Sequence, residues 1–345
     1  MVVTGEDTMG KQSERQQLVG IDVSGKSLQV ALQGVDGVIR DLEFANDAEG
    51  HKLLLGELTK DGETARVCLE ATGNFSLDLS LTLSRQVRIE LMVVNPKAAR
   101  KFAEAQMRRA KTDKVDARSL LDFLKCMPFA PWSAPRRVLL ELRAIARRAS
   151  ALTTDKTAEE NRLAASRATG ETPAVVLEDI QASIDALGVR IDALLDAALA
   201  VVAADVELTQ ALRVLTSVKG IANRSGVVLV AELMMLPKDM TPREVVAHCG
   251  LDPRPKQSGM REGQRSISKI GNSVVRSALF MPALTAARWE PSVKAFYEGL
   301  VTRKKRKMVA VVAVMRRLLQ ALWRMLLANE PFDGSRFAPK HGAAA

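Results

Sequence analysis

Residues 17–44, QLVGIDVSGKSLQVALQGVDGVIRDLEF, decide the fold of the first part of the chain. The runs LVGIDVS, SLQVALQ and VIRDLEF are short and rich in apolar residues, which is typical of β-strands. Turns between these runs are supplied by Gly25 and by the segment Gly34–Gly37. We therefore expect three consecutive antiparallel strands.

Beyond this stretch, helical and strand patterns alternate. Strands are expected at 65–72 (ARVCLEAT) and 88–94 (RIELMVV), and the second must stop before Pro96. Helices are expected at 47–60, 76–85, 97–106 and 113–125. Three antiparallel strands followed by alternating helices and strands describe an α/β sheet of the ribonuclease-H type. Residues 17–130 are predicted to form this domain, after a flexible tail at 1–16.

Four acidic residues in this domain stand in apolar or basic surroundings. Asp22 lies in the first strand, Glu70 ends the fourth, and Asp113 and Asp116 share one face of a helix because they are three residues apart. A carboxylate in a buried strand is costly unless a positive charge compensates for its lost hydration. Carboxylate oxygens suit Mg²⁺, and two such ions can hold the attacking and leaving oxygens of a phosphodiester displacement. The set therefore predicts metal binding and phosphodiester chemistry.

The helical pair has a simpler alternative. Asp113 and Asp116 could form a solvated helix face, balanced by the neighbouring cations Lys111, Lys114 and Arg118. For either residue alone that interpretation is the stronger one. The placement of Asp22 and Glu70 at the matching points of the predicted sheet favours a shared metal site.

A long helical region follows the first domain. The proline-marked stretch PWSAPR (131–136) precedes two helical segments at about 137–166 and 174–204. Apolar residues in the second segment alternate steps of three and four, which is a heptad seam: Leu177, Ile180, Ile184, Leu187, Ile191, Leu194, Ala198 and Val201. Residues 131–205 are predicted to be a linker and an antiparallel coiled-coil arm, with an ordinary bundle helix as the alternative.

Residues 206–330 are predicted to form a mostly helical C-terminal domain, followed by a tail at 331–345. The stretch LTSVKGIANRSGVVLVAEL resembles a helix-hairpin-helix with its turn at Gly220, although Ala222 replaces the usual second glycine. Such a hairpin offers backbone N–H groups to a nucleic-acid phosphate, whereas packing alone would explain the segment without any ligand. A loop rich in glycine, proline and arginine is expected at 252–265, and RKKRK (303–307) precedes a long amphipathic helix.

A serine in that loop is a candidate nucleophile. Ser258 precedes a glycine and lies among the cations Arg254, Lys256, Arg261 and Arg265. A serine hydroxyl needs a base, a metal or dense positive charge to act as a nucleophile, and cations stabilise charge on phosphate oxygens. Residue types alone favour a solvent-exposed loop serine, and the same segment offers the rivals Ser266, Ser268 and Ser273. Tyr297, the only tyrosine, is expected to be a packing residue.

Composition points to a nucleic-acid partner. The formal net charge is +10, whereas aromatic residues make up only 4% of the 345 residues, so contacts to the sugar-phosphate backbone are expected in preference to base stacking. The candidates for phosphate contacts are Arg108, Arg109, Lys111, Lys114, Arg254, Lys256, Arg261, Arg265, Lys269, Arg276, Arg303, Lys304, Lys305, Arg306 and Lys307.

Location can also be predicted. Cys68, Cys126 and Cys249 are isolated and form no disulfide or zinc pattern, which indicates a reducing cytoplasm. The polar start is not a signal peptide, and no apolar run is long enough to cross a bilayer. We expect a soluble protein with no membrane partner.

Eight motifs together resemble one family. GIDVSGKSLQVAL, CLEATG, NPKAARKFAEAQ, KTDKVDAR, VKGIANRSG, GLDPRPKQSG, SISKIGN and EPFDGSR occur in an order similar to that of the DEDD transposases of the insertion-sequence family numbered one hundred and ten, over residues 17–337. The resemblance implies an N-terminal RuvC-like domain, a coiled-coil arm and a C-terminal transposase domain. It assigns the acidic tetrad to Asp22, Glu70, Asp113 and Asp116, and the nucleophile to Ser258.

The resemblance also implies a mechanism and partners. The serine would form a covalent phosphoserine link to DNA, assisted by Mg²⁺-bound carboxylates, before strands are exchanged and rejoined. A bridge RNA would pair with target and donor DNA, and a tetramer, a dimer of dimers, would form composite sites between subunits, in a bacterial cytoplasm and associated with the nucleoid. The alternatives are a RuvC-like structure-specific nuclease without a covalent intermediate, and a nucleic-acid-binding scaffold without activity.

Overall fold

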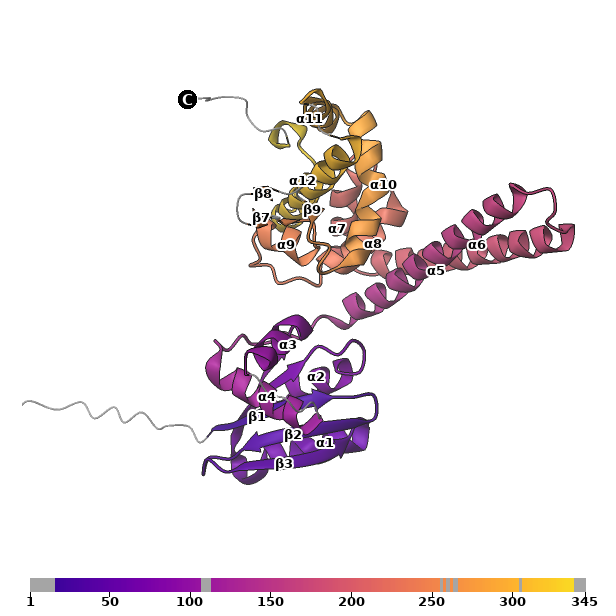
Figure 1. The fold of residues 1–345 in the computed structure, drawn as a ribbon. Coiled ribbons are helices and arrows are strands. Elements are labelled where there is room, and N and C mark those ends of the chain that lie inside the picture. The colour runs from indigo at the N-terminus through magenta and orange to yellow at the C-terminus, as the bar shows by residue number, and fades with distance from the viewer. Residues whose placement is uncertain are drawn as a thin grey trace, which may run out of the picture. The chain divides into compact units, whose positions relative to one another are not determined.

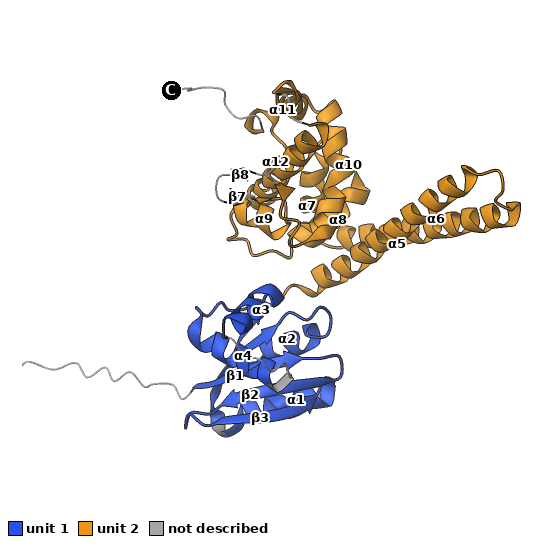
Figure 2. Ribbon diagram, viewed as in Figure 1, with its two compact units in different colours: residues 1–134 blue, residues 135–345 orange. Residues whose placement is uncertain are grey.

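The protein forms two compact units, residues 1–134 and 135–345, in this computed structural model (Figures 1 and 2). The structure describes residues 16–106, 113–254, 257–258, 261–262, 266–303 and 306–337. The predicted tail at 1–16 therefore lies, apart from its last residue, outside the described residues. The division of the chain into three domains stays a prediction.

Unit 1 is built on a five-stranded mixed sheet with the order β3-β2-β1-β4-β5. The first three strands, β1 (Gln16–Val23), β2 (Ser27–Gln33) and β3 (Ile39–Ala45), are consecutive and antiparallel, as predicted. On the other side of β1, the strands β4 (Thr64–Glu70) and β5 (Ile89–Val94) pair in parallel. Parallel strands need crossover connections, and helices supply them.

The four helices predicted for unit 1 are present. They are α1 (Ala48–Leu58), α2 (Leu77–Ser84), α3 (Pro96–Ala105) and α4 (Asp113–Cys126), with a short 3₁₀ turn at Lys60–Gly62. Local sequence explains their starts: Asp47 caps α1 by accepting a hydrogen bond from Gly50 N, and Asn95 caps α3 just before Pro96. Buried residues of α1 and α2 pack on one face of the sheet, and α3 and α4 pack on the other (Figure 1).

Unit 2 begins with two long helices, α5 (Arg137–Arg167) and α6 (Ala174–Ala203), which lie antiparallel along each other (Figure 1). Along the predicted seam, Ile184, Ile191 and Ala198 are buried and the other five positions are half-buried. The predicted helices and their contact face are therefore present. Coiled-coil packing of the pair stays a prediction.

The rest of unit 2 is a helical core. It contains α7 (Val206–Thr216), α8 (Asn223–Leu233), α9 (Pro242–His248), α10 (Ser273–Trp289), α11 (Pro291–Thr302), α12 (Lys307–Ala328) and a 3₁₀ turn at Gly334–Arg336. The base of α5 joins this core, because Leu142 and Ala146 are buried within it. Phe337, in the predicted tail, is also buried there and lies edge-on to Phe296.

The segment predicted as a loop at 252–265, together with the two residues after it, contains short antiparallel strands. β6 (Pro253–Arg254) pairs with β9 (Ser266–Ile267), and β7 (Gln257–Ser258) pairs with β8 (Arg261–Glu262). Two-residue strands show no periodicity, and glycine and proline are typical of loops, so the sequence pattern did not indicate this pairing. Within the described part of the chain, no helix has the length and apolar character that crossing a membrane requires.

Candidate active site and nucleic-acid surface

Two of the predicted acidic residues lie side by side at one edge of the sheet. Ile21 of β1 is in register with Leu69 of the parallel strand β4. The next residues along both strands are Asp22 and Glu70, so they are neighbours at the carboxyl ends of these strands. Both side chains are half-buried.

Alternation along the strands shows which face these two residues occupy. Ile21 is buried in the cluster on the α1–α2 side of the sheet, whereas Cys68 packs against Leu120 on α4. Side chains at positions two apart on a strand share a face. Glu70 therefore lies on the α4 face with Cys68, and Asp22 lies on that face because its neighbour Ile21 points away.

The direction of α4 brings its first turn to the same edge. Leu18 packs against the cluster that contains Leu120 and Leu124, whereas two residues further along β1 a Cβ on Gly20 would overlap the carbonyl oxygen of Ala117. The helix thus runs antiparallel to β1, and the turn before Ala117 approaches the end that holds Asp22. That turn carries the predicted pair: the half-buried Asp116, and Asp113, of which only the backbone is described.

The sheet edge suits Mg²⁺ by the kind of donor it offers. Two adjacent strands supply the neighbouring carboxylates of Asp22 and Glu70, the first turn of α4 carries two more acidic residues, and hard oxygen ligands are those that Mg²⁺ prefers. Among the described side chains, which leave out that of Asp113, no three His, Cys, Asp or Glu residues are grouped closely enough to hold a metal. Metal binding by the four acidic residues therefore stays a prediction.

Ser258 is placed by its backbone. It lies on β7 directly opposite Arg261 on β8. Of its rivals, the exposed Ser266 lies opposite Arg254, whereas the Ser268 hydroxyl donates a hydrogen bond to Asp252. The third rival, Ser273, is the exposed first residue of α10. Ser268 thus has a local structural role, and the choice of Ser258 stays a prediction.

The stretch that carries Ser258, residues 253–267, is here named the serine segment, and its two ends are joined at their root. Asn272 N donates to His248 O over 2.9 Å, Lys269 N donates to Gly250 O over 3.1 Å, and Ser268 N donates to an Asp252 carbonyl 2.9 Å away. These bonds continue the β6–β9 pairing down to the helical core. The segment therefore leaves and re-enters the core at one point.

The predicted phosphate contacts differ in how the structure places them. Arg276 is half-buried and donates to the carbonyl oxygens of Cys249 (2.8 Å) and Gly271 (3.3 Å), so it holds the root of the serine segment. The exposed candidates are Arg254, Lys269, Arg303, Arg306 and Lys307. Only the backbone is described for Lys114 and Arg261, and outside the described residues lie Arg108, Arg109, Lys111, Lys256, Arg265, Lys304 and Lys305.

Two weaker candidates are explained by packing. Gly220, in the turn between α7 and α8, has a φ of 109°, and a Cβ there would lie 2.8 Å from the carbonyl oxygen of Pro282 on α10. The hairpin glycine is thus required by its contact with α10, whether or not a phosphate binds. Tyr297 packs against the core of unit 2, which confirms its expected role.

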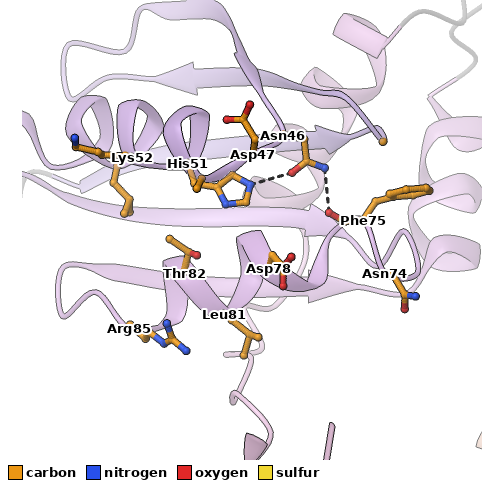
Figure 3. A pocket seen from close by; sticks show the side chains of 13 residues that line it. Asn46, Asp47, His51, Lys52, Asn74, Phe75, Asp78, Leu81, Thr82 and Arg85 are labelled. Carbon is orange, nitrogen blue, oxygen red and sulfur yellow. Dashed lines mark hydrogen bonds between the residues drawn. The ribbon is translucent and has the colours of Figure 1, made fainter. Parts of the chain in front are cut away.

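A cavity of about 510 Å³ lies between α1 and α2, on the sheet face away from α4 (Figure 3). A ring nitrogen of His51 lies 2.9 Å from Asn46 Oδ1, and Asn46 Nδ2 donates to the carbonyl oxygen of Phe75 (Figure 3). Burial lowers the pKa of His51 from 6.5, although Asp78 and Asp47 oppose the shift. These bonds fasten the loop after β4 to α1, which is a structural role.

The sequence reasoning missed one buried acidic residue. Glu232 on α8 is 2% exposed and accepts hydrogen bonds from Arg147 (Nε to Oε1, 2.5 Å; Nη2 to Oε2, 3.1 Å) and from Asn272 Nδ2 (2.6 Å). The more distant Arg143 Nε lies 3.3 Å from Oε2. The signal was available: Glu232 is a lone carboxylate in the apolar run VVLVAELMML, like Asp22 in its strand.

Charge balance keeps this carboxylate ionised. Burial alone would raise the pKa of Glu232, but hydrogen bonds and charge from Arg147, the charge of Arg143 and the Asn272 amide together lower it. Burial also lowers the pKa of His248, and the charge of Arg143 lowers it further. The network thus consists of a carboxylate anion between two guanidinium cations, beside a neutral imidazole.

Family comparisons match both parts of the chain. The model for DEDD transposases of the IS110 type, described as "Transposase", matches residues 19–166, which include the sheet with Asp22 and Glu70. A second model, described as "Transposase IS116/IS110/IS902 family", matches residues 212–298, which include Ser258. Together the two matches span more than half of the chain and define a transposase class. The chain belongs to the IS110 family, which confirms the resemblance found from its motifs.

Individual relatives share parts of the sequence. A pilin gene-inverting protein of Moraxella bovis is 30% identical over 129 residues, which is 37% of this chain and 40% of that protein. The pilin gene-inverting protein of Moraxella lacunata is 34% identical over 93 residues, 26% of this chain and 29% of that protein. A putative transposase, y4rJ, of Sinorhizobium fredii is 30% identical over 130 residues, 35% of this chain and 32% of the relative. The chain thus matches less than half the length of each.

Proposed function

We propose that this protein is a DNA recombinase of an insertion sequence, guided by a bridge RNA and acting through a serine nucleophile. The observation that carries the proposal is the adjacency of Asp22 and Glu70 at the carboxyl ends of β1 and β4, on the sheet face against which α4 packs. It occurs in a chain whose second unit carries Ser258 and matches a transposase family model. Family membership and two gene-inverting relatives support recombination as the reaction class.

Each residue has a proposed part in the chemistry. The Ser258 hydroxyl gives up its proton to solvent as its oxygen attacks a DNA phosphorus, a serine–phosphorus ester forms, and the bond to a deoxyribose oxygen breaks. That oxygen leaves as a hydroxyl after taking up a proton. Attack by the hydroxyl of another strand then releases the serine and rejoins the DNA, so no external energy source is needed. Mg²⁺ held by Asp22, Glu70, Asp113 and Asp116 would stabilise charge on the phosphate oxygens.

The proposed partners follow from the same observations. A net charge of +10 with few aromatic residues supports recognition of nucleic-acid backbones, and an A-form RNA can be recognised by shape. Sequence choice then comes from base pairing between the bridge RNA and the target and donor DNAs. We further propose a dimer of dimers in which the RuvC-like domain of one subunit meets the serine segment of another.

A trapping experiment tests the function. Purified protein, Mg²⁺, the RNA transcribed beside the gene and both DNAs are mixed, and a covalent protein–DNA adduct is sought by denaturing electrophoresis. The adduct should form with wild-type protein and with Ser266→Ala, and it should be absent with Ser258→Ala and with Asp22→Asn. An adduct that survives Ser258→Ala removes that residue from the role. DNA cleavage without an adduct and without RNA would instead show a RuvC-like nuclease.

A further inference from the structure

The network around Glu232 joins three separate elements of unit 2. Its carboxylate comes from α8, its guanidinium partners Arg143 and Arg147 come from the base of α5, and its amide partner Asn272 stands before α10. The carboxylate is completely buried, whereas the two arginines are partly exposed. The network therefore connects the helical pair α5–α6 to the root of the serine segment.

Asn272 is held on three sides. Its Nδ2 donates to Glu232, its Oδ1 accepts from the amides of Val274 and Val275 at the start of α10, and its own amide donates to His248 O. The residue cannot rotate or shift without breaking one of these contacts. Because the serine segment re-enters the core through Asn272, the direction of its returning strand is tied to the Glu232 carboxylate.

Stability alone is a poor reason for such a network. A buried ion pair is often no more stabilising than well-packed apolar residues of similar size, because two charges lose their hydration. Every residue of α8 from Gly226 to Leu233 is buried, and Glu232 is the only charged one among them. What the carboxylate adds, compared with an apolar side chain, is direction: its bonds fix α5 and Asn272 in one relative orientation.

We propose that Glu232 is a positioning residue for Ser258, through which the base of the helical pair α5–α6 fixes the placement of the serine segment. This inference rests on the proposed function, since it needs Ser258 to be the nucleophile. A displacement of α5 relative to α8 changes the pairing at Glu232 and moves Asn272 with it. Misplacing a reacting group by about 1 Å can cost on the order of a hundredfold in rate.

The main test removes the hydrogen bond between Asn272 and Glu232 and keeps the side-chain cap of α10. Asn272→Ser retains a side-chain oxygen for the α10 amides but removes the donor to Glu232. At saturating RNA and DNA, this variant should form the covalent adduct at least about tenfold more slowly than wild type, with its nucleic-acid affinity nearly unchanged. The matched control is Glu207→Gln, which removes an exposed carboxylate paired with Arg136 at the start of α5 and leaves the Asn272 link intact.

Two further measurements separate positioning from general damage. The double variant Glu232→Gln with Asn272→Ser should form the adduct only slightly more slowly than the slower single variant, because both changes break the same connection between Glu232 and Asn272. Hydrogen exchange of the Ser268 and Lys269 amides, which bond across the root, should accelerate in Asn272→Ser and not in Glu207→Gln. If Asn272→Ser does not fold, Arg147→Lys keeps the charge, loses the two-point contact, and should show the same selective loss of rate.

Specific outcomes overturn the proposal. A wild-type adduct rate in folded Asn272→Ser or Arg147→Lys would do so, as would an equal loss in Glu207→Gln or a loss confined to nucleic-acid affinity. Failure of wild-type protein to form any adduct contradicts the proposed function instead. In that case the structural part of the proposal can still be tested. Unchanged hydrogen exchange of the Ser268 and Lys269 amides in Asn272→Ser would show that Glu232 does not hold the root of the serine segment through Asn272.

Discussion

Gly20 on β1 lies against the backbone of Ala117 on α4, so closely that a Cβ on Gly20 would overlap the Ala117 carbonyl oxygen and the Leu121 amide nitrogen. This contact lets α4 approach the sheet without intervening side chains. The contact sets how closely α4, whose first turn carries Asp113 and Asp116, packs on the sheet face that holds Asp22 and Glu70. We therefore predict that Gly20 is needed for α4 to pack closely on the sheet face that holds Asp22 and Glu70.

Adding one methyl group at this position should separate the helix from the sheet. Gly20→Ala cannot be relieved by a side-chain rotation, since the clashing atoms are backbone, and it should lower the free energy of unfolding by about 1–3 kcal/mol. Metal-dependent adduct formation should fall as well. Gly56→Ala on the exposed face of α1 is the control, with open space around its Cβ, and it should stabilise by about 0.5–1 kcal/mol. Equal effects at both positions in chemical denaturation would contradict the account.

The three thiols should differ sharply in reactivity. Burial raises the pKa of Cys68 to about 12 and that of Cys249 to about 12, whereas Cys126 at the end of α4 is exposed. Iodoacetamide at neutral pH should therefore modify Cys126 alone in the folded protein, and Cys126→Ser should abolish fast labelling, as measured by mass spectrometry. Because Cys68 lies beneath α4, its labelling should accelerate in Gly20→Ala and not in Gly56→Ala.

Stability should fall in mild acid through two histidines. Burial lowers the pKa of both His51 and His248 from 6.5, so the unfolded chain binds protons that the folded chain does not. Each histidine's contribution to the free energy of unfolding is complete above pH 6.5 and is lost as the pH falls through the pKa of the folded state. For each residue, the free energy of unfolding falls by at most about 1.4 kcal/mol per pH unit over that range. Denaturation at pH 7.5 and 5.5 measures this loss. His51→Gln and His248→Gln should each reduce it, and an unchanged loss in both would exclude these residues as its source.

Much of unit 1 could be predicted because its signals are local. The strands at 17–44 and the placement of Asp22 and Glu70 follow from runs of apolar residues and their ends. The role of Gly20 did not follow, since its partner Ala117 is distant in sequence and a strand glycine has many explanations. Glu232 showed the same signal as Asp22, yet its meaning depends on arginines from α5 and on Asn272, which only the folded chain brings together.

Two candidate phosphate contacts should behave differently. Lys269 is exposed and has a φ of 54°, a conformation that asparagine tolerates, so Lys269→Asn should leave stability unchanged. If it contacts a phosphate, the salt dependence of nucleic-acid affinity should weaken by about one unit of slope. Arg276→Met removes bonds to two backbone carbonyls and should instead lower the free energy of unfolding by about 1–3 kcal/mol. Thermal melts and binding titrations check both predictions. A stability loss in Lys269→Asn, with a weaker salt dependence and unchanged stability in Arg276→Met, would mean that Arg276 contacts phosphate and Lys269 has the structural role.

Mixing two inactive variants distinguishes a site shared between subunits from a site within one. Ser258→Ala retains the carboxylates and Asp22→Asn retains the serine, so a mixed dimer holds one complete site only if the two halves come from different protomers. With random mixing, about half of the dimers are mixed and one of the two sites in each is intact, so about one quarter of all sites should form the adduct. If each site is built within one protomer, no site is intact. Asp22→Asn mixed with Glu70→Gln is the matched control, because both changes damage the same half and no pairing repairs it. After joint refolding to exchange subunits, the first mixture should form the adduct and the second should not. No adduct in the first mixture contradicts the composite site, because mixed dimers would then pair intact carboxylates with an intact serine and still be inactive.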